Sequence, residues 1–356
     1  MAVPQAIQVI DADGHILEPG DVWDEYLPRE YRAYAPGWAR DSQGRNRRMI
    51  GGRMQPAWPT LDYDTKPVEG ASDANARLRD MDDLGISIGY LFPSAGLHFG
   101  AIDRLDVVEV LSRAYNEWIR DFCAADRHRL RAAAVVPQLD VAAAMRETER
   151  AIGELGLSAV MLRPNPIGGR TLDDPTFDPL WSLLEELDVP LALHEATTMN
   201  VPQAGLDRYD NYMFLHVITH PHEHQMAALS LICGGVLQRH PKLRVAFFES
   251  GCGWVPYWLE RMEQHIDYWG HASAPLAERP TDYWQRQCFV SPFPDEKTVP
   301  QVIASIGAHS LIYTTDYPYP YPGLENAVSA MRDRPDVSDA DKQTILHDNA
   351  ARFYRI

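Results

Sequence analysis

The amino-acid sequence predicts an α/β protein, a single (β/α)8 TIM barrel with a long insertion after its first strand. Short apolar runs rich in β-branched residues alternate with amphipathic helical patterns along all 356 residues. This alternation is typical of a parallel sheet with helical crossovers, and eight such runs match the strand number of a closed barrel. No glycine-rich dinucleotide motif follows the first run, which counts against an open Rossmann-type sheet. We therefore treat residues 1–356 as one barrel domain.

The predicted strands are apolar runs bounded by polar or turn-forming residues: Ile7–Asp13, Ile86–Phe92, Leu130–Val136, Ala159–Leu162, Pro190–His194, Leu243–Glu249, Cys288–Ser291 and Leu311–Thr315. The predicted helices lie between them and repeat their apolar residues at helical spacing: Asp73–Leu84, Val107–Ala125, Val141–Leu155, Phe177–Leu187, Gln225–Gln238, Trp254–His265 and Glu296–Ser305. Parallel strands need such long crossovers, so the order of elements supports the barrel.

Two segments do not fit the repeat. Residues 18–70 contain prolines, tryptophans, tyrosines and an Arg-Asn-Arg-Arg cluster, with little periodicity. An insertion after a barrel strand lies at the C-terminal face, where we expect a lid or a subunit contact. The second segment, Glu195–His222, follows the fifth strand and is also predicted to be irregular.

The composition and net charge of the chain exclude several classes of binding partner. The apolar fraction of 45% supports a hydrophobic core, and no stretch approaches the roughly 20 apolar residues of a membrane span. A net charge of −17 argues against nucleic acid or an anionic membrane as partner. We expect a small-molecule substrate, which would respond to the local field of a pocket and not to the net charge. The four cysteines lack paired spacing, and the first residues lack the pattern of a signal peptide. We expect a cytoplasmic protein with free thiols.

The ends of the predicted strands carry candidate metal ligands. Asp13 and His15 are two residues apart, so an extended chain points both side chains to one face. His194, Glu249 and Asp316 each follow another apolar run. Because the C-terminal strand ends of a barrel converge on one mouth, we expect these five side chains to meet there and bind a divalent metal.

The segment from Thr219 to His224 offers a sixth ligand. Pro221 suits the first turn of a helix, and Glu223 suits its positive end. His220 would then lie just outside the helix and could turn into the mouth, so we favour it over His222 and His224.

Substrate contacts and self-association are predicted from three positions. Arg163 ends the fourth strand, where a guanidinium could hold a carboxylate, or could equally form a structural ion pair. Asn165 could orient that group, and Trp254 could line the pocket. The apolar stretch Trp254–Trp258 and the insertion suggest a homo- or hetero-oligomer.

These residues resemble the amidohydrolase-related branch of the amidohydrolase superfamily, which includes aminocarboxymuconate-semialdehyde decarboxylase and related aromatic acid decarboxylases and hydrolases. The motifs that carry the resemblance cover nearly the whole chain: Asp11–Pro19, Leu162–Pro166, His194–Glu195, Gly234–Arg244, Phe248–Arg261 and Thr315–Pro318. The resemblance implies a metal-dependent barrel with Asp13, His15, His194 and Asp316 as ligands.

Two positions depart from the family pattern. The usual first motif is His-x-His or Glu-x-His, but this chain has Asp13-Gly14-His15. Many members have a histidine at the end of strand six, where this chain has Glu249. We therefore expect a carboxylate-rich site with two ions of iron or manganese, in which Glu249 and Asp316 also take part in the chemistry.

Three functions remain open at this point. The first is oxygen-dependent hydroxylation of a small, carboxylate-bearing substrate by the dinuclear site. The alternative is metal-dependent hydrolysis or non-oxidative decarboxylation of a small carboxylic acid, with zinc as the expected ion. The third is a non-catalytic subunit of a hetero-oligomer, against which the complete ligand set argues.

Overall fold

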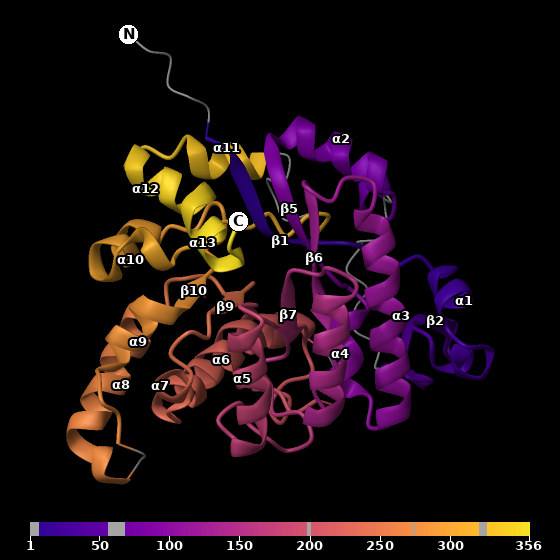
Figure 1. Cartoon of the computed structure of the whole chain (residues 1–356), viewed down its shortest axis with the longest axis horizontal. Helices are drawn as coiled ribbons and strands as arrows, with labels where there is room; N and C mark the ends of the chain where they lie inside the picture. The colour runs from indigo at the N-terminus through magenta and orange to yellow at the C-terminus, as the bar shows by residue number, and fades with distance from the viewer. Residues whose placement is uncertain (1–6, 56–67, 198–200, 273–274, 320–325) are drawn as a thin grey trace.

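A curled parallel sheet forms the centre of the computed structural model, which describes residues 7–55, 68–197, 201–272, 275–319 and 326–356 (Figure 1). Its strands follow one another in space in the same order as in the sequence. They are β1 (Val9–His15), β5 (Ile86–Phe92), β6 (Leu130–Val135), β7 (Ala159–Leu162), β8 (Leu191–His194), β9 (Val245–Phe248) and β10 (Cys288–Val290). Every neighbouring pair is parallel, as a TIM barrel requires.

The predicted eighth strand closes the barrel as an irregular segment. Leu311 pairs with Val290 of β10 in an isolated parallel bridge. On the other side, the N–H of Ala12 in β1 donates to the carbonyl oxygen of Tyr313 at 3.0 Å. The segment therefore lies between β10 and β1. The barrel prediction is confirmed, with seven regular strands in the part of the chain that the structure describes.

The central strands are apolar on both faces. All residues of β7, β8 and β9 are buried. Side chains fill the barrel interior on one face and helices cover the other, so these strands show no alternation of apolar and polar residues. For the seven regular strands, the predicted bounds differ from the observed bounds by at most two residues.

The helices lie around the outside of the sheet (Figure 1). They are α1 (Val22–Tyr26), α2 (Ala74–Leu84), α3 (Leu105–Cys123), α4 (Val141–Gly153), α5 (Asp178–Glu186), α6 (Tyr212–Cys233), α7 (Val236–Arg239), α8 (Val255–Trp269), α9 (Pro280–Gln287), α10 (Val299–Ile306), α11 (Ala327–Arg332), α12 (Asp339–Gln343) and α13 (Asn349–Tyr354). The sequence analysis did not predict α9 or the C-terminal helices α11–α13.

Helix α6 corrects two predictions. The stretch Glu195–His222 is predicted to be irregular, but the helix begins at Tyr212, where the side chain of Asn211 caps it. Pro221 therefore lies inside the helix and not in its first turn, and His220 is a helical residue. Proline lacks a backbone donor and usually interrupts a helix, which is why the sequence pattern suggested a boundary here.

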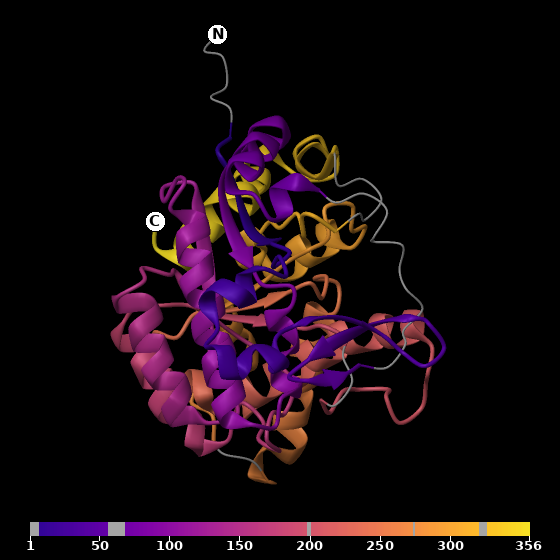
Figure 2. The same cartoon turned by 90° about the vertical axis from the view of Figure 1, so that its right-hand side faces the viewer.

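The insertion after β1 also contains regular structure, which the sequence analysis did not predict. Its β2 (Gly37–Arg40), β3 (Asn46–Ile50) and β4 (Arg53–Met54) form a small antiparallel sheet beside the barrel (Figure 2). Residues 56–67 of the predicted insertion lie outside the described residues. The guanidinium of Arg48 in β3 contacts Nε2 of His98 at 2.7 Å, and His98 follows the C-terminal end of β5. This contact confirms that the insertion lies at the C-terminal face.

Within the described ranges, no helix combines the length and the apolarity that crossing a bilayer would need. Cys123, Cys233, Cys252 and Cys288 are free cysteines.

Candidate metal centre

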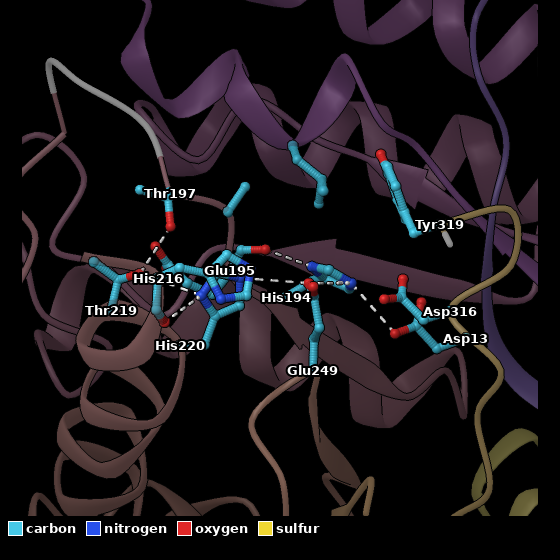
Figure 3. A network of polar contacts seen from close by, with 12 residues as sticks. Asp13, His194, Glu195, Thr197, His216, Thr219, His220, Glu249, Asp316 and Tyr319 are labelled. Atoms are coloured by element: carbon cyan, nitrogen blue, oxygen red, sulfur yellow. Dashed lines mark hydrogen bonds and ion pairs between the residues drawn. The ribbon is translucent and has the colours of Figure 1, made fainter. Parts of the chain in front are cut away.

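The six predicted ligands come from four strand ends and one helix, and the structure brings them to one mouth of the barrel. Figure 3 labels all of them except His15. Asp13 and His15 lie at the end of β1, and His194 is the last residue of β8. Glu249 directly follows β9, Asp316 follows the closing segment, and His220 comes from α6. They form two adjoining groups.

The first group consists of Asp13, His15, His194 and Asp316. One ligand atom from each of Asp13, His15 and His194 lies within 4.8 Å of the others, and all three residues are buried. Nε2 of His15 is 3.1 Å from Nε2 of His194 and 3.3 Å from Oδ1 of Asp316. Nε2 of His194 is 3.3 Å from Oδ2 of Asp13. Two imidazoles and two carboxylates thus surround one small space.

Backbone carbonyls orient both imidazoles. Nδ1 of His15 is 2.9 Å from the carbonyl oxygen of Pro93, and Nδ1 of His194 is 2.7 Å from that of Glu195. A carbonyl can only accept, so in each neutral ring the proton is on Nδ1 and the lone pair is on Nε2. The two Nε2 atoms therefore face each other as acceptors. This is how metal-binding histidines are held by their neighbours.

The carboxylates of this group have free acceptor oxygens. Among the described residues, Oδ1 of Asp13 and both side-chain oxygens of Asp316 are buried without a hydrogen-bond partner. Buried acceptors without a donor are costly, and here they face two imidazole lone pairs. A divalent cation satisfies all of them, so the residues present fit a metal ion.

The pKa shifts of the buried groups also agree with a metal ion at this position. Burial raises the pKa of Asp316 well above its usual value, and the carboxylates of Glu249 and Asp13 raise it further. Burial alone would lower the pKa of His194, but the carboxylates of Asp13 and Glu249 raise it to about 9. Without a metal, a proton on His194 would have to supply part of the missing positive charge.

The second group consists of His216, His220 and Glu249. One ligand atom from each lies within 4.8 Å of the others. Nε2 of His220 is 3.5 Å from Oε2 of Glu249, and that oxygen is also 3.7 Å from Nε2 of His194 in the first group. The sequence analysis overlooked His216. Its four-residue spacing from His220 would have indicated it, had the helix been extended to Tyr212.

The glycine between Asp13 and His15 is required by packing. A Cβ atom at Gly14 would lie 2.4 Å from Nη2 of Arg77. That buried guanidinium donates from Nη1 to the carbonyl oxygen of His15 at 2.8 Å and lies 3.9 Å from the ring centroid of Tyr317. Arg77 thus supports the strand end that carries both predicted ligands.

Arg163 and Asn165 lie close together and are buried. Nη2 of Arg163 contacts Oε1 of Glu195 at 2.9 Å, its Nη1 donates to the carbonyl oxygen of Leu97, and its Nε donates to Oδ1 of Asn165. These contacts match the structural ion pair, the second of the two roles left open for Arg163. The substrate role of both residues stays a prediction.

Trp254 packs against aromatic rings beside β9. Its ring centroid is 6.1 Å from that of Phe247 and 5.7 Å from that of Trp284 in α9. Its predicted place in the substrate pocket stays a prediction.

Arg48 is a cation near the mouth that the sequence analysis did not single out. Besides contacting His98, it acts electrostatically on Tyr319, whose ring centroid is 5.1 Å from that of His15. Among the described residues, Arg48 forms no ion pair with a carboxylate within 4.0 Å. The Arg-Asn-Arg-Arg cluster of the insertion, which contains Arg48, was the sequence feature that could have indicated it.

A family model described as amidohydrolase matches residues 10–356. The chain belongs to the amidohydrolase family. Its resemblance to the branch with aromatic acid decarboxylases is confirmed, since it is 27% identical over 296 residues to a gamma-resorcylate decarboxylase from Rhodococcus jostii (strain RHA1), covering 79% of this chain and 87% of the relative. It is an enzyme of a metal-dependent superfamily, as predicted.

Solved structures share the fold of this chain. An amidohydrolase from Mycobacterium avium subsp. paratuberculosis K-10 has a TM-score of 0.83 at 22% identity, covering 99% of both chains. A dihydroxybenzoic acid decarboxylase from Polaromonas sp. JS666, with bound manganese and an inhibitor, has a TM-score of 0.71 at 20% identity, covering 98% of this chain and 97% of that one. Decarboxylation, the alternative prediction, is thus the activity named among the relatives.

Proposed function

We propose that this chain is a metal-dependent, non-oxidative decarboxylase of a small aromatic carboxylate. The observation that carries the proposal is the first ligand group, in which two oriented imidazoles and two carboxylates converge, with buried oxygens that lack donors within the part of the chain that the structure describes. The sequence relative named as a decarboxylase supports the choice of reaction. Oxygen-dependent hydroxylation, the leading prediction from sequence, has no such support among the relatives.

Asp13, His15, His194 and Asp316 would hold one divalent ion, which we propose is manganese. Mixed carboxylate and imidazole ligands suit manganese or iron, and the Polaromonas decarboxylase contains manganese. When bound, the ion draws negative charge from substrate oxygen atoms and fixes their position.

The reaction breaks the bond between the ring carbon and the carboxylate carbon. The carboxylate leaves as CO2, the bonding electron pair stays on the ring carbon, and a proton takes its place. We propose that Asp316 delivers this proton. Both of its carboxylate oxygens are buried without a hydrogen-bond partner among the described residues, and burial raises the pKa of this group, which favours the protonated form that a proton donor needs.

We assign the anchoring of an anionic substrate to Arg48 in place of Arg163. Arg163 is buried against Glu195, whereas Arg48 has its guanidinium beside His98 at the C-terminal face. A guanidinium without a carboxylate partner among the described residues can pair with an acidic group of the substrate at little cost.

Oxygen-dependent hydroxylation stays as the second candidate because Glu249, His216 and His220 adjoin the first ligand group. That reaction consumes one O2 and two reducing equivalents from an external reductant per hydroxylated product, with water as the second product. A cytoplasmic location and self-association through Trp254–Trp258 also remain proposals from the sequence.

The test is an anaerobic assay of the manganese-loaded chain with a panel of hydroxybenzoic acids, followed by chromatography and CO2 detection. We expect substrate loss with equimolar CO2, and a loss of at least about 100-fold in kcat for Asp316→Asn. Arg48→Gln should raise KM about 10-fold or more with a smaller change in kcat. Turnover that needs O2 and a reductant, with no CO2 released, would replace this function by hydroxylation.

A further inference from the structure

We propose that His216, His220 and Glu249 hold a second divalent cation beside the first, with Glu249 shared between the two sites. This inference relies on the metal site of the proposed function and adds a second site with its own ligands. It does not depend on which reaction the enzyme catalyses. Figure 3 shows Glu249 between His194 on one side and the two α6 histidines on the other.

The α6 histidines are spaced for a shared ligand. Four residues along a helix bring His216 and His220 to the same face one turn apart. Their rings are nearly parallel, with centroids 4.1 Å apart and an interplanar angle of 24°. Two histidines at this helical spacing are a common way to bind a transition metal.

Polar neighbours orient His220 toward Glu249. Nδ1 of His220 is 3.2 Å from the carbonyl oxygen of His216 and 3.2 Å from Oγ1 of Thr219. Thr219 is itself 3.1 Å, oxygen to oxygen, from Thr197 in the segment after β8. With Nδ1 engaged, Nε2 of His220 is left to face Oε2 of Glu249 at 3.5 Å. The ring is therefore held as a ligand would be.

The other two histidines of this helix are placed differently. His222 is exposed, and its Nδ1 is 2.9 Å from the carbonyl oxygen of Ile218. His224 is buried, with Nδ1 at the carbonyl oxygen of His220 and Nε2 at that of Leu193. His224 thus has both ring nitrogens engaged. The structure therefore separates two ligand histidines from two histidines with other roles.

Glu249 connects the two groups. Its Oε2 lies 3.5 Å from Nε2 of His220 and 3.7 Å from Nε2 of His194. A carboxylate between two imidazoles of different groups is placed to bridge two cations. The second site offers two nitrogens and one oxygen from the protein, a set that suits manganese, iron or zinc and leaves open positions. Two cations would also offset the charges of Asp13, Glu249 and Asp316 in the buried mouth.

The test is a titration of the untagged, chelator-treated chain with Mn2+ alone, with bound metal measured after dialysis by mass spectrometry. We expect two Mn2+ per chain in the wild type and one in His216→Ala. We also expect the electron paramagnetic resonance spectrum of the doubly loaded protein to show coupling between neighbouring ions, and that of His216→Ala to lack it. His222→Ala, on the same helix, is the matched control and should keep both ions and the coupling.

The outcomes separate the two proposals. One Mn2+ per wild-type chain would overturn the second site and leave the decarboxylase proposal intact. No bound Mn2+ at all would overturn both. Two ions in His216→Ala would show that the second ion lies elsewhere. His216→Gln, which keeps the polarity and approximate size of the side chain, replaces His216→Ala if circular dichroism shows that the alanine variant is unfolded.

Discussion

Glu249 and Asp316 have backbone conformations that side-chain-bearing residues avoid. Their φ angles are +58° and +57°, in the left-handed region. For an L-residue this conformation costs about 1–2 kcal/mol. Glu249 directly follows β9 and Asp316 directly follows the closing segment, so the strain lies where both side chains turn into the candidate metal centre. The requirement of the site, and not local preference, explains these two turns.

The buried pair of Arg163 and Glu195 predicts a large effect on stability. Arg163→Met would leave the carboxylate of Glu195, which has no exposed surface, without its guanidinium partner. We expect the free energy of unfolding to fall by about 3–5 kcal/mol, measured by urea denaturation. The double variant Arg163→Met/Glu195→Gln should recover much of the loss. A loss below about 1 kcal/mol together with a raised KM would instead support the substrate role predicted from sequence.

Glu223 is a buried acid whose environment favours its protonated form. Burial and the nearby carboxylate of Glu195 raise its pKa to about 7, against the hydrogen bond from the N–H of Ala204 and the charge of Arg163. Asn165 also interacts with it and lowers its pKa. The folded state thus binds this proton more tightly than the unfolded chain does. The resulting stabilisation is complete below the usual pKa of 4.5 and is lost as the pH rises through about 7.

Replacing Glu223 by glutamine should therefore flatten the pH dependence of stability. Between pH 5 and 8, in chelator, we expect the free energy of unfolding of the wild type to fall by about 2 kcal/mol relative to Glu223→Gln. Chemical denaturation at several pH values measures this difference. Glu186→Gln, at an exposed position, is the control and should follow the wild type. Parallel curves for the wild type and Glu223→Gln would contradict the prediction.

At the scale of elements, the turn between β9 and α8 is tied down by one side chain. The carboxylate of Glu296 accepts hydrogen bonds from the N–H of Cys252 at 3.0 Å and from that of Gly253 at 2.8 Å. A Cβ atom at Gly253 would lie 2.6 Å from Oγ1 of Thr298, so glycine allows this close approach. Glu296 thus holds the turn that begins with Glu249.

Removing that carboxylate should loosen the turn and weaken the second metal site. For Glu296→Ala we expect a loss of about 2 kcal/mol in the free energy of unfolding, since hydrogen bonds to a charged group are lost. Affinity for the second Mn2+ should fall about 10-fold because Glu249 is less well placed. Asp295→Ala, the exposed neighbour, should change neither quantity. Unchanged stability and metal binding in Glu296→Ala would contradict this role.

At the scale of the whole molecule, several buried carboxylates from distant parts of the chain meet where the cations would bind. The net charge is −17. The carboxylates of Asp13 and Asp316 are both buried, and both lie close to the imidazole of His15. Carboxylates gathered in a buried mouth repel one another until a cation binds. Metal binding should therefore contribute to the stability of the entire barrel, because the ligands come from β1, β8, β9 and the closing segment.

Manganese should raise the thermal midpoint and chelation should lower it. At a free Mn2+ concentration about 1,000 times the dissociation constant, one bound ion adds about 4 kcal/mol to the free energy of unfolding. Differential scanning fluorimetry with Mn2+ or with a chelator measures the shift. His194→Ala should lose most of it, and His222→Ala should keep it. Equal midpoints in both buffers would contradict a metal centre at this mouth.

Local patterns predicted the strands well and the helices around the mouth poorly. Buried strands such as β7 are short apolar runs, which the sequence shows directly. The first turns of α6 were missed because Pro221 suggested a helix start. That error hid His216, since its partner His220 was thought to lie outside the helix. The sheet of the insertion was missed because its short strands carry several charged residues without alternation.

The sequence alone was enough to predict the barrel and the candidate ligands at the strand ends, because strand periodicity and the residue that ends each strand are local properties. Tertiary structure alone decided which distant groups meet. It paired Arg163 with Glu195, brought Arg48 to His98 and joined His216 and His220 to Glu249. These contacts depend on how helices and insertions pack over the mouth, which no local pattern in one chain specifies.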